Sequence, residues 1–155
     1  MPRDAKYWLM KSEPSEFSID DLVASPEQKV GWFGVRNYQA RNFMVREMKI
    51  GDPCFFYHSS CKEPGIYGVV EVCSKPYPDP TQFDPGSGYF DEAATRDKPR
   101  WFQVDVRFRR KTRFVSIADL RANAKLSTMR VLQKGNRLSI TPVTANEWKI
   151  ISTML

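Results

Sequence analysis

The chain has 155 residues, of which 41% are hydrophobic and 27% charged, a composition that excludes extended disorder and is typical of a folded domain. Lysine and arginine total 24 against 18 aspartate and glutamate residues, so a net charge of +6 favours polyanionic partners without identifying one. We expect a single domain over residues 1–155, because each half alone would be marginally stable.

The sequence gives no sign of secretion or of a membrane segment. Residues Met1–Lys6 are charged and lead into Tyr7–Met10 without the apolar stretch and small-residue cleavage site of a signal peptide. No apolar run approaches the roughly 20 residues that cross a bilayer as a helix. We therefore expect a soluble, cytoplasmic monomer.

Cysteine and histidine content argues against a metal centre. Cys54, Cys61 and Cys73 have spacings that match no zinc or thioredoxin-like pattern, and His58 is the only histidine. Strand alternation places Cys54 and His58 on one face and Cys61 in the following loop, which disfavours a site built from these three residues. We expect reduced thiols, no metal and no cofactor.

In the first third of the chain, Tyr7–Met10 is predicted to be a short buried strand that ends in a polar turn. The spacing of Ser18 and Asp21 is typical of a capping box and predicts a short helix to about Ser25. An aromatic loop bracketed by glycines follows at Val30–Arg36. Asn37 is placed to cap a helix over Tyr38–Ile50, whose apolar residues share one stripe.

The middle of the chain predicts a hairpin followed by irregular structure. Two strands, Cys54–Tyr57 and Ile66–Cys73, are joined by the polar connection His58–Gly65 with its Pro-Gly turn. The segment Ser74–Pro99 is rich in Pro, Asp and Gly and has no helical period. Long segments of this kind are commonly functional or disordered, and its scattered aromatic residues favour packing against the body.

The last third alternates strands and short helices. Arg100–Phe108 has the alternation of a strand, and Leu138–Pro142 is predicted to be a strand that ends at its proline. Capping patterns at Ser116 and Thr144 predict two short helices. The order of elements predicts an α+β fold in which short helices flank a curled, mixed, barrel-like sheet.

Motifs of familiar enzymes are absent from the sequence, which contains no GxGxxG, P-loop, HExxH or GxSxG pattern. One alternative remains an enzyme that acts on a modified base or small nucleotide with His58, Cys61 and Lys62 in one loop. The other is a protein–protein adaptor that binds its partner through Ser74–Pro99. We favour a binding protein without catalytic activity.

Aromatic and polar residues coincide at predicted strand ends and helix starts, where they can face a common cleft. A base removed from its stack requires a flat apolar surface and hydrogen-bond partners for its edge. Each ring taken alone is more often part of a core. The residues that suggest a base pocket are Trp32, Tyr38, Tyr57, Ser12, Asn37, His58 and Ser59.

Basic residues form a dense group at the end of the predicted strand Arg100–Phe108. Alternation puts four of them on one face, as a phosphate track or as a charged, solvated strand edge. These four are Arg107, Arg109, Lys111 and Arg113. The same two interpretations apply to Arg36, Arg41 and Arg46.

Together, five segments in order along the chain resemble the EVE domain family: Tyr7–Pro14, Gly34–Phe43, Phe55–Ser60, Lys62–Ile66 and Tyr77–Phe83. The resemblance covers nearly the whole chain and implies a PUA-like fold, similar to YTH and ASCH domains. It also implies a nucleic-acid-binding protein that reads a modified base, either modified cytosine in DNA or a modified RNA base.

What the resemblance implies for the site is a pocket near Lys11, Ser12, Trp32, Val35, Arg36, Asn37, Tyr38, His58, Ser59 and Lys62. Trp32 is expected to stack on the base, while Asn37 and Ser59 contact its edge. Ser12 and His58 are expected to line the pocket, and Arg36 and Lys62 to contact phosphate. Further phosphate contacts are expected from Arg41, Arg46, Arg107, Arg109 and Lys111.

Overall fold

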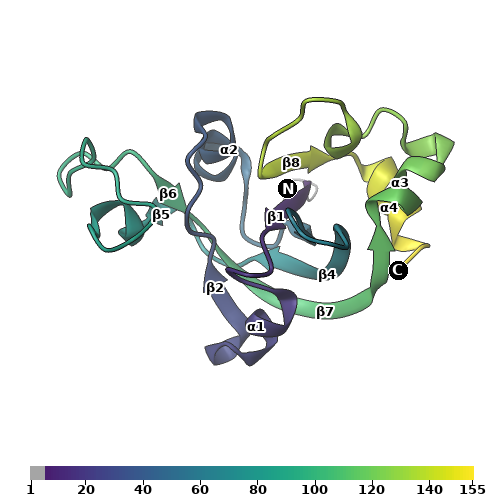
Figure 1. The fold of residues 1–155 in the computed structure, drawn as a ribbon, viewed down its shortest axis with the longest axis horizontal. Coiled ribbons are helices and arrows are strands. Elements are labelled where there is room, and N and C mark those ends of the chain that lie inside the picture. The colour runs from purple at the N-terminus through teal and green to yellow at the C-terminus, as the bar shows by residue number, and fades with distance from the viewer. Residues whose placement is uncertain (1–5) are drawn as a thin grey trace, which may run out of the picture.

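A curled six-stranded sheet forms the centre of the computed structural model, which describes residues 6–155 (Figure 1). The neighbouring strands are, in order, β2 (Lys29–Gly31), β7 (Asp105–Ser116), β4 (Gly65–Val72), β3 (Pro53–His58), β1 (Tyr7–Ser12) and β8 (Ile140–Val143). Within this sheet β1 and β3 run parallel, and the other neighbours run antiparallel. The mixed, curled sheet confirms the predicted fold class. The expectation drawn from the charged N-terminus falls largely on residues 1–5, which lie outside the described part.

The curl of the sheet comes from irregular pairing between β4 and β7. The register shifts twice along this pair, between Ile66 and Gly68 and between Val69 and Val70. Each shift inserts extra residues into β7, and such bulges bend a strand and increase its twist. Gly68 permits the close packing at the bend, because a Cβ there would lie 2.7 Å from Ile19 Cδ1.

Three helices begin with the predicted capping boxes, at Ser18, Ser116 and Thr144. The helices are α1 (Ile19–Ala24), α3 (Ile117–Ala122) and α4 (Ala145–Ser152). In each one the capping hydroxyl accepts the N3 backbone N–H, and the N3 carboxylate accepts the N-cap N–H. These local exchanges satisfy donors that a helix start otherwise leaves open. The three predictions are confirmed.

The prediction of one continuous helix over Tyr38–Ile50 was wrong. The chain forms α2 (Tyr38–Asn42) and then a π-helical turn at Phe43–Glu47, in which the Met48 N–H donates to Phe43 O at 2.8 Å. The wider turn brings Met48 to the same buried side as Phe43, and both are at least nine-tenths buried. Tertiary packing has overridden the regular helical period at this point.

Two further strand predictions need correction. Arg100–Phe108 is interrupted at Val104: β6 (Phe102–Gln103) pairs with β5 (Tyr77–Pro78), and β7 begins at Asp105. The Val104 carbonyl instead accepts the Trp32 N–H at 2.8 Å. Pro142 does not end its strand, because β8 is an edge strand, where the missing N–H breaks no ladder.

Both faces of the sheet are covered by buried side chains. On one face Trp8, Met10 and Phe56 belong to a core that includes α2, and on the other Leu9 and Phe55 pack towards α3 and α4. Short 3-10 turns complete the connections, at Pro26–Gln28, Pro80–Phe83, Ala124–Leu126 and Arg130–Leu132. Successive residues of β1 and β3 thus point into different cores, which explains why both strands are apolar without interruption.

Candidate functional site

An open cavity of about 450 Å³ lies where the end of β1 meets the loop after β2. Its size falls within the ~300–1,000 Å³ of typical small-molecule sites. It is lined by residues 11–13, 16–17, 30–35 and 59–60, together with Tyr89, Arg137 and Ser139. Its walls therefore come from segments far apart in the sequence.

Trp32 forms a fixed aromatic part of the wall. Its ring meets Phe56 edge to face, with centroids 5.4 Å apart, and only 6% of the residue is exposed. The backbone N–H bond to Val104 anchors it to the strand edge. Trp32 consequently offers a rigid partial face to the cavity and also belongs to the core.

The polar side of the cavity follows from the parallel pairing of β1 with β3. Ser12 pairs with His58 at the ends of the two strands, and the Ser59 N–H donates to Ser12 O at 3.0 Å. The Ser12 hydroxyl donates to Phe17 O at 2.6 Å. Lys11 also lines the cavity, and burial lowers the pKa of its ammonium group. Serine, lysine and backbone groups thus converge on one edge of the cavity.

Tyr89, from the long segment between β5 and β6, forms another part of the wall. Its hydroxyl donates to both carboxylate oxygens of Glu16, at 2.5 and 2.7 Å. Its ring lies edge to face with Phe33, with centroids 5.9 Å apart. Gly34, at φ +82°, lies so close that a Cβ there would be 2.7 Å from the Tyr89 ring. Burial and the bond to Glu16 raise the pKa of Tyr89 to about 12, so it remains a donor at neutral pH.

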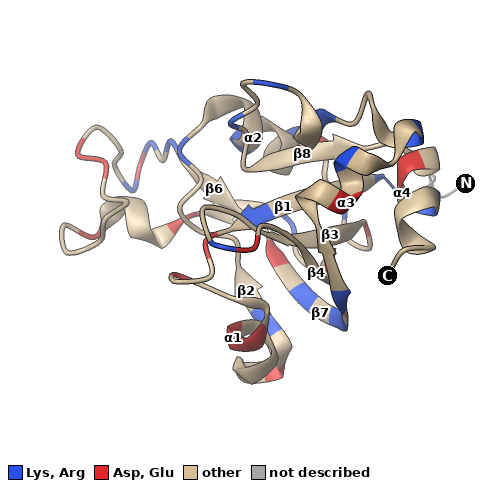
Figure 2. Cartoon of the chain, turned by 45° about the vertical axis from the view of Figure 1, so that its right-hand side comes forward, with Lys and Arg blue, Asp and Glu red and all other residues tan. Residues whose placement is uncertain are grey.

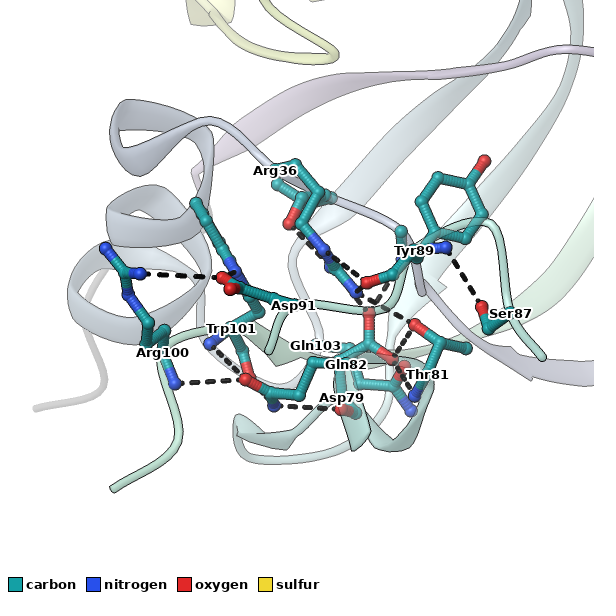
Figure 3. A network of polar contacts seen from close by, with 12 residues as sticks. Arg36, Asp79, Thr81, Gln82, Ser87, Tyr89, Asp91, Arg100, Trp101 and Gln103 are labelled. Atoms are coloured by element: carbon teal, nitrogen blue, oxygen red, sulfur yellow. Dashed lines mark hydrogen bonds and ion pairs between the residues drawn. The ribbon is translucent and has the colours of Figure 1, made fainter. Parts of the chain in front are cut away.

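Arg36 holds this segment in place through the network in Figure 3. Its guanidinium donates to Tyr89 O at 3.1 and 2.6 Å, to Val35 O, to Thr81 Oγ1 and to Asp79 Oδ2. These bonds use all five of its N–H groups. Arg36 was expected to contact phosphate, but the structure places its guanidinium in an internal anchor.

Asp79 and Gln82 complete the anchor and are both fully buried. Asp79 accepts the Gly34 N–H at 2.7 Å, in addition to bonds from Arg36 and Thr81. Gln82 donates to Asp79 O and Trp101 O and accepts two backbone N–H groups (Figure 3). The segment is therefore bound to the body by satisfied polar groups.

The structure brings five of the ten expected pocket residues to the cavity: Lys11, Ser12, Trp32, Val35 and Ser59. The other five, Arg36, Asn37, Tyr38, His58 and Lys62, lie outside its lining. Asn37 caps α2, its Oδ1 accepting the Ala40 N–H at 3.0 Å. Tyr38 stacks on Trp101 with centroids 4.8 Å apart and is 45% exposed. Lys62 is exposed on the turn between β3 and β4.

His58 is engaged in the fold. Its Nε2 accepts the Ile19 N–H at the start of α1, at 3.1 Å, and its ring stacks on Tyr67 with centroids 4.0 Å apart. Only 6% of the residue is exposed, and burial lowers the pKa of the imidazole. His58 was expected to line the pocket, but its side chain instead accepts a hydrogen bond from the start of α1.

The basic residues expected to contact phosphate differ in whether their side chains already have partners in the protein. Arg107 and Arg109 form ion pairs with Glu71, and Lys111 lies 2.7 Å from Asp20. Arg109 sits at a bulge, because Phe108 and Arg110 pair with consecutive residues of β4, so strand alternation does not keep the basic residues of β7 on one face. Figure 2 shows basic residues as blue segments along β7. Arg41 donates to Arg100 O and Asn42. Arg46 is exposed and has no ion pair within residues 6–155.

Several site residues escaped the sequence prediction: Glu13, Glu16, Phe33, Tyr89, Arg137 and Ser139. Tyr89 carried a weak signal as an aromatic residue in an otherwise polar segment. Asp79 and Gln82 lie within Tyr77–Phe83, one of the segments with family resemblance, but nothing local predicts their burial. Glu16 and Arg137 carry no local signal, because exposed charges are common in loops.

The described residues offer no metal site and no membrane-spanning element. Within residues 6–155, no three His, Cys, Asp or Glu side chains are grouped to hold a metal ion, and the three cysteines are free. No helix in the same range has the length and hydropathy required to cross a bilayer.

Comparison with known proteins identifies a matching family model and similar proteins. The EVE domain model matches residues 6–154. Human thymocyte nuclear protein 1 is 43% identical in a match that covers 97% of this chain and 74% of that protein. The chicken protein of the same name is 42% identical in a match that covers 96% of this chain and 68% of the relative.

Solved structures show the same fold. Human thymocyte nuclear protein 1 in complex with 5-methylcytosine containing DNA superposes with a TM-score of 0.91 at 43% identity, covering 97% of each chain. A Pseudomonas syringae protein gives 0.90 at 48% identity over 96% of this chain and 98% of its own. An ASCH protein from Zymomonas mobilis, 10% identical with a TM-score of 0.57 over 96% and 98% of the two chains, shares the fold alone.

Proposed function

Because the chain belongs to the EVE domain family, we propose that it binds DNA and holds one modified cytosine in the cavity beside Trp32. The observation that carries the proposal is the open cavity itself, in which an aromatic wall faces serine, lysine and backbone groups. The human relative that was solved with 5-methylcytosine containing DNA supports this choice of ligand.

The cavity has the chemistry that an extruded base requires. A base that leaves the duplex loses its stacking partners, and a protein ring restores about 1–3 kcal/mol of stacking per base. Trp32 and Phe33 supply apolar surface, which also suits a methyl group at C5. Lys11 and Ser59 supply donors beside it for the acceptors of the base edge.

Phosphate contacts are expected from exposed basic residues, of which one lines the cavity. Arg137 is exposed and lines the cavity, so it is placed to meet the strand that carries the extruded base. We retain Lys62 and Arg46 as further phosphate contacts, because both are exposed and neither has an ion pair within residues 6–155. Arg107, Arg109 and Lys111 would have to exchange their acidic partners for phosphate.

We favour binding without turnover. An enzyme built on His58, Cys61 and Lys62 requires a free imidazole as base, and the His58 Nε2 is bonded to the Ile19 N–H. Mass spectrometry of modified oligonucleotides after incubation with the protein tests this: unchanged bases are expected. A new base product that disappears in His58→Ala would establish the catalytic alternative.

Fluorescence anisotropy tests the proposed function. Oligonucleotides of one sequence carry either cytosine or 5-methylcytosine at one position, as single strands, duplexes and RNA. We expect tighter binding to the methylated DNA, and loss of that preference in Ser59→Leu, which fills the cavity from a half-buried position. Ser127→Leu, exposed and outside the cavity, is the matched control. Equal affinity for both DNAs contradicts the proposal, and a stronger preference for the RNA redirects it to RNA.

A further inference from the structure

A pocket for 5-methylcytosine must also reject thymine, which carries the same methyl group at C5. The two bases differ on their polar edge: cytosine presents an amino donor at C4, whereas thymine presents a carbonyl acceptor there. Contacts to the methyl group cannot separate them. A polar group in the cavity that accepts but cannot donate is therefore required.

Glu16 has this character. It lines the cavity, and an ionised carboxylate only accepts hydrogen bonds. The Tyr89 hydroxyl, which donates to both oxygens at 2.5 and 2.7 Å, fixes the carboxylate at the cavity wall. One hydroxyl proton leaves most of the roughly four lone-pair directions of the carboxylate available.

Tyr89 is itself held from several sides, so the carboxylate is not free to turn away. Its carbonyl accepts two N–H groups of Arg36, whose guanidinium lies 5.5 Å from the centroid of the Tyr89 ring. The ring meets Phe33 edge to face and leaves no room for a Cβ on Gly34. Arg36 in turn forms an ion pair with the buried carboxylate of Asp79.

From this arrangement we infer that Glu16, positioned by Tyr89, is the specificity determinant of the cavity and selects pyrimidines that carry a C4 amino group. Cytosine and its C5-modified forms belong to this class, and thymine and uracil do not. The inference rests on the proposed function, since it assigns a role within the same cavity. The amino group donates to the Glu16 carboxylate, and a C4 carbonyl in its place would face a negative charge.

Glu92 provides a control outside the cavity. It is exposed, carries the same charge as Glu16 and does not line the cavity. No hydrogen bond or ion pair of its carboxylate is found within residues 6–155. Replacing Glu92 thus makes the same change in net charge without altering the cavity.

The test measures affinities for duplexes that differ at one base, 5-methylcytosine, cytosine or thymine, each opposite an abasic site so that no base pair is lost. The wild-type protein is expected to prefer 5-methylcytosine over thymine by roughly 5- to 150-fold, the range for one good contact to a base edge. Glu16→Gln is expected to bring this ratio close to one, because its amide also donates to a carbonyl. Tyr89→Phe is expected to lower the ratio, and Glu92→Gln to leave it unchanged.

Two results would overturn the inference: an unchanged ratio in Glu16→Gln, or an equal loss in Glu92→Gln. Comparing ratios removes the general gain in DNA affinity that follows the loss of an acidic group. Absence of any wild-type preference for 5-methylcytosine over cytosine contradicts the proposed function itself. A preserved preference over cytosine together with an unaltered thymine ratio in Glu16→Gln overturns only the role of Glu16.

Discussion

Arg36 and Asp79, 43 residues apart in sequence, form an ion pair with Nη1 3.2 Å from Oδ2, and the Asp79 side chain is fully buried. The pair ties the loop after β2 to the segment that supplies Tyr89, and hence joins two walls of the cavity (Figure 3). The shape of the candidate site therefore depends on a contact between two residues that lie outside the cavity lining.

Removal of the Arg36 side chain is expected to destabilise the fold strongly. Arg36→Ala leaves the buried Asp79 carboxylate without its cation, a change that typically costs ~3–5 kcal/mol of the free energy of unfolding. Urea unfolding measures it. Arg110→Ala, an exposed arginine without an ion pair within residues 6–155, is expected to stay within about 0.5 kcal/mol of wild type. Equal effects of the two variants would contradict the anchoring role.

Alanine substitutions at two glycines distinguish the cost of backbone strain from the cost of steric crowding. Gly34 and Gly135 have nearly the same φ, +82° and +80°, but a Cβ on Gly34 meets the Tyr89 ring whereas one on Gly135 meets nothing within 4 Å. Gly135→Ala is expected to cost about 1–2 kcal/mol from the left-handed backbone alone. Gly34→Ala is expected to cost more and to weaken binding to methylated DNA, since Tyr89 must move. Unfolding and anisotropy titrations check both, and identical losses would speak against close packing of Tyr89.

Stability is expected to fall as the pH drops below about 6.5, the ordinary pKa of histidine. Burial lowers the pKa of His58 in the folded protein, although Asp20 and Asp21 oppose the shift, so the unfolded chain takes up a proton first. The contribution of neutral His58 to the free energy of unfolding is thus fully present above pH 6.5. It is lost as the pH falls from there towards the lowered pKa of His58 in the folded protein. Protonation also removes the acceptor for the Ile19 N–H.

Urea unfolding of wild type and His58→Gln between pH 8 and 5 measures this dependence. We expect the glutamine variant to be less stable at pH 8 and to change less between pH 7 and 5.5, a range above the titration of ordinary carboxylates. Parallel pH profiles for the two proteins would show that His58 does not cause the dependence.

Arg137 is expected to act on phosphate and not on the base. Arg137→Gln should weaken binding to methylated and plain DNA by the same factor, and should reduce the slope of log affinity against log salt by about one. Lys149→Gln, a basic residue of α4 outside the cavity, is the control and should leave the slope unchanged. A change in the ratio between the two DNAs would place Arg137 at the base instead.

Local chemistry made much of the fold predictable. The capping boxes at Ser18, Ser116 and Thr144 were visible because both partners lie within four residues. The π-helical turn after α2 could not be predicted, because it depends on how Met48 packs in a core built from residues distant in sequence. The break at Val104 likewise reflects a change of partner strand, which no alternation pattern records.

The candidate site was predictable where it follows strand ends and obscure where it depends on long-range contacts. Ser12 and Ser59 line the cavity because β1 and β3 end side by side. Asn37 and His58 carry the same polar chemistry, but each bonds to the start of a helix. Glu16 and Tyr89 are separated by 73 residues, so their bond is invisible in a single sequence.

Entry of a methylated cytosine into the cavity beside Trp32 can be observed directly by NMR. A duplex with ¹³C-labelled methyl on one 5-methylcytosine, bound to the protein, permits nuclear Overhauser contacts from that methyl group to be assigned by NMR. We expect contacts to cavity residues such as Trp32 or Phe33, with loss of the contacts to neighbouring stacked bases. A methyl group that keeps its contacts within the base stack and shows none to the cavity would contradict the proposed function.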